Sequence, residues 1–193
     1  MKSIHFYDTI ELKCKGVFEK MRKNATEGIE IERKYIIKMP RLTLLSKEEK
    51  YTESEILQIY LKADDGVTRR IRRRLYPDRR EYTETKKLRI DRMSATEIER
   101  QISEEEFTSF RESILEGTRP LSKTRHTFEY HGQLFEIDVY PEWRNTAIME
   151  TELESREQSV DFPPFIHILC EVTGDKRYSN ASMSKAFPEE IDL

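Results

Sequence analysis

Two features that narrow down the function of many proteins are nearly missing here: paired cysteines and long apolar runs. The chain has 193 residues but only two cysteines, Cys14 and Cys170, whose spacing matches no metal or redox motif. His126 and His131 lie close together without a cysteine or a third histidine, so we expect no zinc site. We therefore expect a reduced, cytoplasmic protein. No segment resembles a signal peptide or is apolar for long enough to span a bilayer, so we expect no membrane partner.

The chain also lacks an excess of either charge. Lysine and arginine (34 residues) nearly balance aspartate and glutamate (37 residues), which leaves a formal net charge of −3. Nucleic-acid-binding proteins usually carry a basic excess, so we expect no nucleic-acid partner. Low net charge together with nine tyrosines and nine phenylalanines argues against disorder. Charged residues nevertheless make up 37% of the chain, so charges of both signs must be placed with local order.

The segment 30–37 shows how such charges are placed. As a β-strand, it would alternate its side chains between two faces. Glu30, Glu32 and Lys34 then share one face, and Tyr35 lies on the other. Two carboxylates followed by an ammonium group suit a site for a divalent cation and the phosphate bound to it, although a solvated edge strand would show the same pattern.

Further strands and a few helices are predicted along the chain. The predicted strands cover residues 56–61, 67–75, 82–88, 95–102, 123–128, 135–140 and 148–155. The predicted helices cover 42–51 with a cap at Ser46, 103–117 with a capping box, 163–169, and 179–186. Residues 1–27 are predicted to be a helical N-terminal extension, and residues 28–193 a single domain.

Charges of one sign are sorted by strand. The rows are Arg70, Arg72 and Arg74; Lys123 and Arg125; Glu97 and Glu99; and Glu150, Glu152 and Glu154. Neighbouring like charges repel, so such rows favour stability only if a ligand compensates both signs. A polyphosphate with bound Mg²⁺ or Mn²⁺ does so, because its oxygens bind Arg and Lys and its metal binds carboxylates.

We therefore predict an α+β fold: a closed eight-stranded antiparallel β-barrel, or tunnel, with a charged lumen and helices packed outside. The strand 82–88 is expected to place Lys86 on the charged face with Tyr82 and Glu84. An open sheet with one solvated charged face is the alternative.

The ordered set of charged motifs resembles the CYTH, or triphosphate tunnel metalloenzyme, superfamily. The motifs are Glu30-x-Glu32-x-Lys34, Arg70-x-Arg72, Lys86, Glu97-x-Glu99, Lys123-x-Arg125, Asp138, Glu150-x-Glu152-x-Glu154 and the ending from Thr173 to Asn180. The resemblance implies a tunnel that processes triphosphates with a divalent metal. The long extension before Glu30, and Lys176 where proline is common, depart from the family pattern.

The resemblance also implies roles for individual residues. Ligands of Mg²⁺ or Mn²⁺ would be Glu30, Glu32, Asp138, Glu150 and Glu152. Substrate phosphates would be held by Lys34, Arg70, Arg72, Lys86, Lys123, Arg125, Arg177 and Lys185. The residues expected to act in catalysis are Lys34, Glu30, Glu32 and Tyr60.

The expected function is metal-dependent hydrolysis of a linear triphosphate, with inorganic triphosphate favoured. The same tunnel could act on nucleoside or thiamine triphosphate, or cyclise ATP like a class IV adenylate cyclase. These organic substrates need a stacking platform, and the lone Trp143 is more typical of packing. A non-catalytic polyphosphate or nucleotide sensor is the alternative from another class, but the acidic rows favour catalysis. We expect a small-molecule triphosphate as partner and leave a homodimer open.

Overall fold

The computed structural model describes residues 25–192. Residues 25–27 begin the first strand, and the rest of the predicted extension 1–27 lies outside the described residues, so its helix stays a prediction. No helix in the described part of the chain is long and apolar enough to cross a membrane.

Nine strands form one sheet in the described chain. The strands are β1 (Ala25–Lys38), β2 (Glu49–Leu61), β3 (Val67–Leu75), β4 (Arg80–Arg89), β5 (Ser94–Gln101), β6 (Leu121–Tyr130), β7 (Gln133–Val139), β8 (Thr146–Glu152) and β9 (Ile168–Glu171). The helices are α2 (Leu42–Leu45), α3 (Glu104–Phe110) and α4 (Asn180–Met183), with 3-10 turns η1 (Arg111–Ser113) and η2 (Lys176–Tyr178).

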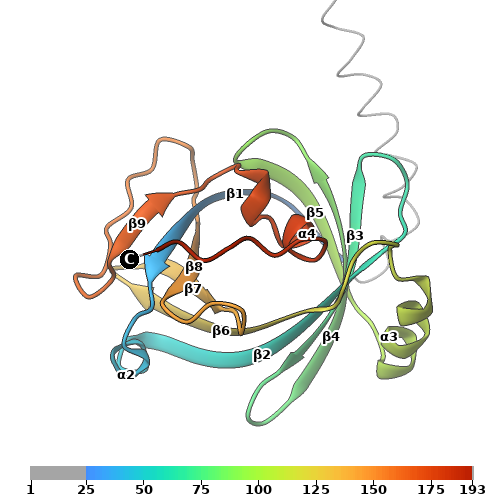
Figure 1. Cartoon of the computed structure of the whole chain (residues 1–193), viewed down its shortest axis with the longest axis horizontal. Coiled ribbons are helices and arrows are strands. Elements are labelled where there is room, and N and C mark those ends of the chain that lie inside the picture. Colours follow the sequence, from blue (N-terminus) through green and yellow to red (C-terminus); the bar gives the residue numbers. More distant parts are fainter. Residues whose placement is uncertain (1–24, 193) are drawn as a thin grey trace, which may run out of the picture.

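The long strand β1 closes the barrel. Its residues 25–31 pair with β5 and its residues 32–38 pair with β8, both antiparallel. The strands between follow in the order β5, β4, β3, β2, β6, β7, β8, so eight strands form a ring, and β9 adds to β1 (Figure 1). The predicted closed eight-stranded antiparallel barrel is confirmed.

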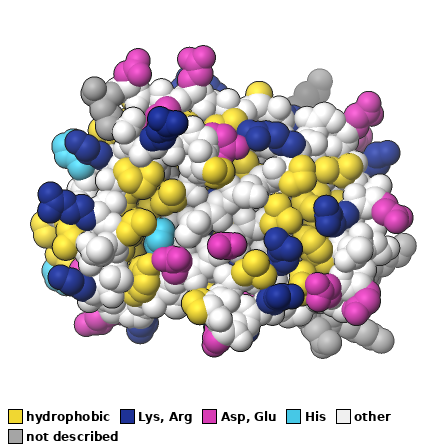
Figure 2. Space-filling model, turned by 60° about the horizontal axis from the view of Figure 1, so that its bottom comes forward, with side chains coloured by type: hydrophobic (Ala, Val, Ile, Leu, Met, Phe, Trp, Pro, Cys, Tyr) yellow, Lys and Arg dark blue, Asp and Glu magenta, His cyan; other side chains and the backbone are white. Residues whose placement is uncertain are grey.

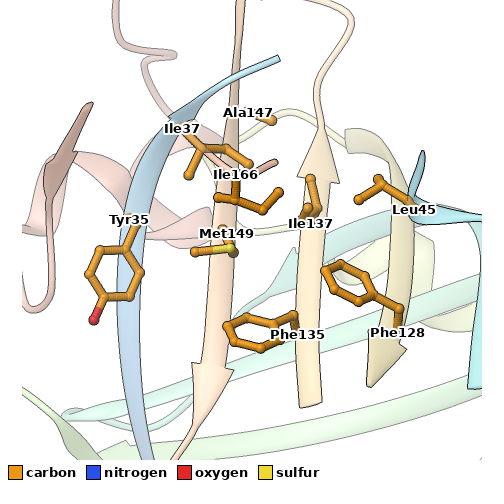
Figure 3. Packing of buried hydrophobic residues seen from close by; sticks show 9 residues of the cluster. All are labelled: Tyr35, Ile37, Leu45, Phe128, Phe135, Ile137, Ala147, Met149 and Ile166. Atoms are coloured by element: carbon orange, nitrogen blue, oxygen red, sulfur yellow. The ribbon is translucent and has the colours of Figure 1, made fainter. Parts of the chain in front are cut away.

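The apolar faces of the strands point outward and are covered there. One outer cluster contains Tyr35, Ile37, Leu45, Phe128, Phe135, Ile137, Ala147, Met149 and Ile166 (Figure 3). Leu45 comes from α2 and Ile166 from the segment before β9, so these two pieces of chain cover the strands. The rings of Phe128 and Phe135 stack with centroids 5.6 Å apart. Each fully buried side chain of this size contributes about 1.5–3 kcal/mol.

A second outer cluster fixes α3. Phe107 of this helix packs with Ile59 and Ile71 on the outward faces of β2 and β3. The predicted capping box is present, because Ser103 Oγ accepts from Glu106 N and the Glu106 carboxylate accepts from Ser103 N. The helix ends earlier than predicted, at Phe110, because the chain returns to the barrel.

Apolar side chains also fill one end of the barrel interior. This plug contains Ile36, Leu121, Tyr140, Trp143, Ile148, Val172, Tyr178 and Met183. Ile36, Leu121 and Ile148 occupy the inward positions next to the charged positions of their strands, and the C-terminal segment supplies Tyr178 and Met183. Trp143 is 4% exposed and its Nε1 donates to the Pro188 carbonyl at 3.1 Å, as expected for a packing residue.

Two helix predictions are wrong. Ser46 lies at the C-terminal end of α2 rather than capping a helix that follows, and β2 begins at Glu49. The predicted helix 163–169 is a turn followed by β9, because Ile168 and Cys170 pair with the backbone of β1. Pairing with a neighbouring strand outweighs the weak local preference for helix. The short helix α4 falls inside the predicted helix 179–186.

Glu190 fastens the C-terminal tail beneath the plug. Its Oε1 accepts from the backbone N–H groups of Arg144 at 3.0 Å, Asn145 at 2.5 Å and Thr146 at 2.8 Å. Burial alone would raise the pKa of Glu190, but the N–H groups of Asn145 and Arg144 outweigh burial and lower it.

We expect Glu190→Gln to lower the free energy of unfolding by about 1–2 kcal/mol, because a neutral amide oxygen is a weaker acceptor than a carboxylate. The carboxylate stabilises the fold above its unfolded-state pKa, and this contribution is lost as the pH falls through the lower folded-state pKa. The difference from wild type in urea denaturation should therefore shrink below about pH 4. Glu189→Gln, at the exposed neighbouring position, is the control, and an equal loss in both variants would contradict this role.

Candidate functional site

The inward faces of the strands enclose a cavity of about 910 Å³. Its charged lining residues are Glu30, Glu32, Lys34, Arg70, Arg72, Arg74, Lys87, Arg89, Asp91, Arg92, Glu97, Glu99, Arg125, Glu136, Glu150, Glu152, Asp175 and Lys176. The outer surface differs: on the face shown in Figure 2, acidic and basic side chains are interspersed. The sorted rows predicted from the sequence thus meet inside the barrel.

Arg70 and Arg72 lie in the middle of β3 with donors that no group satisfies. The Nε atoms of both are buried without a hydrogen-bond partner among the described residues. The Arg72 guanidinium donates to Gln58 Oε1 at 3.3 Å, and the Gln58 amide donates to Tyr60 Oη at 2.8 Å. Burial and the nearby Arg70 charge lower the pKa of Arg72 to about 10, so it stays protonated at neutral pH. Arg70 Nη2 lies 3.5 Å from Glu97 Oε2, whereas Arg72 has no ionic partner among the described residues. Buried cations with such open Nε donors suit a multivalent anion.

The acidic rows of β1 and β8 meet across the barrel seam. Glu32 and Glu152 are cross-strand partners, as are Lys34 and Glu150. Lys34 Nζ lies 2.6 Å from Glu150 Oε1. Burial would raise the pKa of Glu150, but Lys34 and Arg125 outweigh burial and hold it well below its usual range.

Glu152 has no such cation beside it. Burial and the carboxylates of Glu136 and Glu32 raise the pKa of Glu152. Two like charges with no cation between them are an unfavourable arrangement in the isolated protein, and a bound cation would relieve it.

Lys87 is the lysine that reaches the cavity from β4. Its Nζ lies 2.5 Å from Glu97 Oε1 and 3.1 Å from Glu30 Oε2. Burial and Glu97 raise the pKa of Glu30 to about 7, although Lys87 lowers it.

The prediction that Lys86 lies in the lumen is wrong. Lys86 lines a small outer pocket with Lys62 and Arg69, and its neighbour Glu84 is buried outside the barrel against Arg69 and Arg100. A shift of one residue moves a side chain to the opposite face of a strand. Both faces of β4 carry polar residues, so its pattern did not identify the inner one.

Lys123 and Asp138 lie beneath the cavity rather than on its wall. Both side chains are 0% exposed and form an ion pair with each other. Asp138 also accepts from Arg125, with Nε to Oδ1 at 2.7 Å and Nη2 to Oδ2 at 2.8 Å. Burial would raise the pKa of Asp138, but Arg125 and Lys123 lower it. In this arrangement Asp138 orients Arg125 and does not line the cavity as the predicted metal ligand would.

The C-terminal residues are also placed differently from the prediction. Arg177 and Lys185 are exposed and are not part of the cavity lining, and Arg177 pairs with Asp175 at 2.7 Å. The cavity instead receives Lys176, together with Arg89 and Arg92 near the turn between β4 and β5. The sequence indicated these three cations only through Lys176, which stands where proline is common in the family.

The donor set fits a hard divalent cation. Glu32 and Glu152 face the cavity on adjacent strands, and neither forms an ion pair within the described chain. Glu30 and Glu150 also line the cavity but are bound to Lys87 and Lys34. Among the described residues no three His, Cys, Asp or Glu side chains form a complete metal site. Mg²⁺ commonly uses one or two carboxylates and completes its shell with water and substrate phosphate, so two free carboxylates suffice.

Asp138→Asn is expected to destabilise the fold by about 3 kcal/mol, because it leaves two buried cations partly uncompensated. Glu136→Gln removes a carboxylate that also pairs with Arg125 but is 25% exposed, so a smaller loss, about 1 kcal/mol or less, is expected. Urea denaturation of both variants measures the difference. Equal losses would show that Asp138 has no special part in holding Arg125 and Lys123.

Neither a comparison with models of protein families nor one with curated proteins returns a match. Solved structures do match. Two crystal structures of NE1496, described as a hypothetical protein in one and as an inorganic triphosphatase in the other, are 29% identical to this chain. They cover 82% and 83% of this chain and 99% and 97% of their own, with TM-scores of 0.51 and 0.53. PH1819 from Pyrococcus horikoshii OT3 shares the fold at 20% identity and a TM-score of 0.51, over 66% of this chain and 80% of its own.

The ring of strands, the order of acidic and basic rows along it, and the likeness to NE1496 over most of both chains agree. Together these observations support the resemblance of this chain to the CYTH, or triphosphate tunnel metalloenzyme, superfamily.

Proposed function

We propose that this protein hydrolyses a linear inorganic triphosphate with the help of Mg²⁺ or Mn²⁺. One observation carries the proposal: buried guanidinium donors of Arg70 and Arg72 without partners face the same cavity as the free carboxylates Glu32 and Glu152. The structural neighbour NE1496 is described as an inorganic triphosphatase, which supports a hydrolase role for this chain.

The basic residues bind and orient the substrate. Arg70, Arg72 and Lys87 approach the cavity from adjacent strands and would donate to phosphoryl oxygens. In a poorly solvated interior these interactions are stronger than in water. They also stabilise charge that shifts among the phosphoryl oxygens in the transition state.

The acidic residues supply the other half of the site. Glu32 and Glu152 would hold the divalent cation, with Glu30 and Glu150 as further ligands once the substrate competes for Lys87 and Lys34. When bound, such a cation supplies Lewis-acid polarisation of phosphoryl oxygens and lowers the pKa of bound water. Glu136, which lines the same side of the cavity and pairs with Arg125 through one carboxylate oxygen, would accept a hydrogen bond from the attacking water with the other.

The cavity lining favours an inorganic substrate over an organic one. Tyr60 is the aromatic side chain in the described lining, and it is 4% exposed and hydrogen-bonded to Gln58. Trp143 belongs to the plug. Neither ring offers a free face to a base or a thiazole ring. The unpaired carboxylates argue in turn against a sensor, because phosphate binding alone needs only the basic rows. Catalysis by Tyr60, a cytoplasmic location and a homodimer stay predictions.

Glu32→Gln and Glu152→Gln should each lower metal-dependent release of phosphate from inorganic triphosphate by about 100-fold or more, because removing a metal ligand removes its charge stabilisation. The measurement is phosphate release with Mg²⁺, Mn²⁺ or EDTA. Triphosphate binding in EDTA should persist in both variants, since the basic rows remain. Full metal-dependent turnover in both variants would exclude this ligand assignment.

Lys87→Met and Lys86→Met form a matched pair that tests the register of β4. Lys87→Met should raise the KM for triphosphate about 10-fold, because one charge-assisted contact is lost. Lys86→Met should leave KM within about two-fold, because that side chain points away from the cavity. A larger rise in KM for Lys86→Met than for Lys87→Met would show instead that Lys86 faces the cavity, as the sequence predicted.

A further inference from the structure

A group of cations lines the cavity away from the inner arginines. Arg89 and Arg92 belong to β4 and the turn that follows it, and Lys176 to η2, and all three side chains are exposed. Arg89 donates to the Arg92 carbonyl at 3.4 Å and Arg92 to the Thr173 carbonyl at 3.2 Å. None of the three forms an ion pair within the described chain. We call these three residues the mouth cations.

The acids beside the mouth cations are already bound elsewhere. Asp91 pairs with Arg156, and its Oδ1 accepts from the N–H groups of Met93 and Ser94. Asp175 pairs with Arg177 and accepts from its N–H. None of the mouth cations therefore has an ion-pair partner among the described residues, although Arg177, and after it the charge of Arg92, lowers the pKa of Asp175.

The mouth is a preformed structure. The turn after β4 packs directly on Gly174, where an added Cβ would lie 2.9 Å from Arg92 Cβ. Gly174 has a φ of +72°, which side chains disfavour. Arg156 pairs with Asp91 on the other side of the turn, so the backbone that carries Arg89 and Arg92 is held between two segments and needs little ordering on binding.

The mouth continues the inner phosphate site. Arg70 pairs across the strands with Thr85, and the inward positions that follow Thr85 on β4 are Lys87 and Arg89. These positions lie about 7 and 13 Å further along the strand. A triphosphate held by Arg70, Arg72 and Lys87 would leave the mouth cations free, whereas a longer chain of phosphates would reach them.

The opposite direction is less favourable to such a chain. Past Arg72 on β3 the lining continues with Arg74, whose Nε already donates to Ser54 Oγ at 2.8 Å. On β1, β7 and β8 the cavity presents Glu32, Glu136 and Glu152, which repel additional phosphates. A sugar or base at the mouth would also gain nothing from three cations. The chemistry of the mouth therefore points to an anionic extension of the substrate.

We propose that Arg89, Arg92 and Lys176 form an outer anion subsite that binds the phosphoryl units of linear polyphosphates longer than triphosphate. This inference rests on the proposed function, because it extends the same substrate outward. The protein would bind longer inorganic polyphosphates more tightly than triphosphate.

Equilibrium binding in EDTA at physiological ionic strength tests the proposal without turnover. The probes are triphosphate and a longer linear polyphosphate, measured by calorimetry at equal chain concentration. Arg89→Ala/Lys176→Ala should weaken binding of the longer chain about five-fold and that of triphosphate less than about two-fold, as expected for exposed charge contacts. The single variant Lys176→Ala, whose side chain makes no hydrogen bond in the described chain, should show a smaller effect in the same direction.

Lys86→Ala/Lys185→Ala is the matched control, since it removes the same charge from positions outside the cavity. It should leave the ratio of the two affinities unchanged. Equal weakening of both probes in the mouth variants, or no change in either, would overturn the outer subsite while leaving the inner site intact. A wild-type protein that binds triphosphate but neither hydrolyses it nor prefers longer chains would refute both proposals. Hydrolysis without a length preference would refute only this one.

Discussion

Charge that cannot be removed from water keeps the interior of this barrel from collapsing. Dehydrating a single unpaired ion costs several kcal/mol, and each of the strands β1, β3, β5 and β8 directs ions into the cavity. A small barrel normally fills its interior with side chains. Here the ions face a cavity of about 910 Å³, and the apolar residues lie on the outer faces beneath α2, α3 and the segment before β9. The cavity is a consequence of this inversion.

The ions inside the barrel divide into those that hold the structure and those that are left free. Lys123 and Asp138 pair with each other beneath the cavity, and Asp138 also holds Arg125 of the cavity wall. Arg72 and Glu152 have no ionic partner in the described chain, although they lie in the same lumen. The buried ion pairs fix the backbone around them. The unpaired side chains are therefore held in place by their neighbours and can still bind a ligand. A site for an anion and its cation needs this division.

The plug and the C-terminal segment make the two ends of the barrel different. Ile36, Leu121 and Ile148 lie next to the charged positions of their strands, at one end of the barrel, and the C-terminal segment packs on them through Tyr178. The same segment then carries Lys176 to the cavity. Lys176 at the cavity and Tyr178 in the plug both belong to η2, so the packing of the tail also positions a charge at the mouth. An organic group extending from the site would meet ions there rather than an aromatic ring.

Strand alternation alone determined the charged faces of β1, β3, β5 and β8, because a period of two leaves only two choices of face and the apolar side must be covered. It did not decide whether the sheet closes into a barrel, since an open sheet with one charged face would show the same pattern. It could not decide the face of β4, where Thr85 and Lys87 alternate with Glu84 and Lys86. Only the tertiary structure decided that question, because Glu84 is neutralised by Arg69 and Arg100 under α3. It also decided which ions pair: Lys87 meets Glu30 from 57 residues away, and such distant partners come together only when β1 closes the ring.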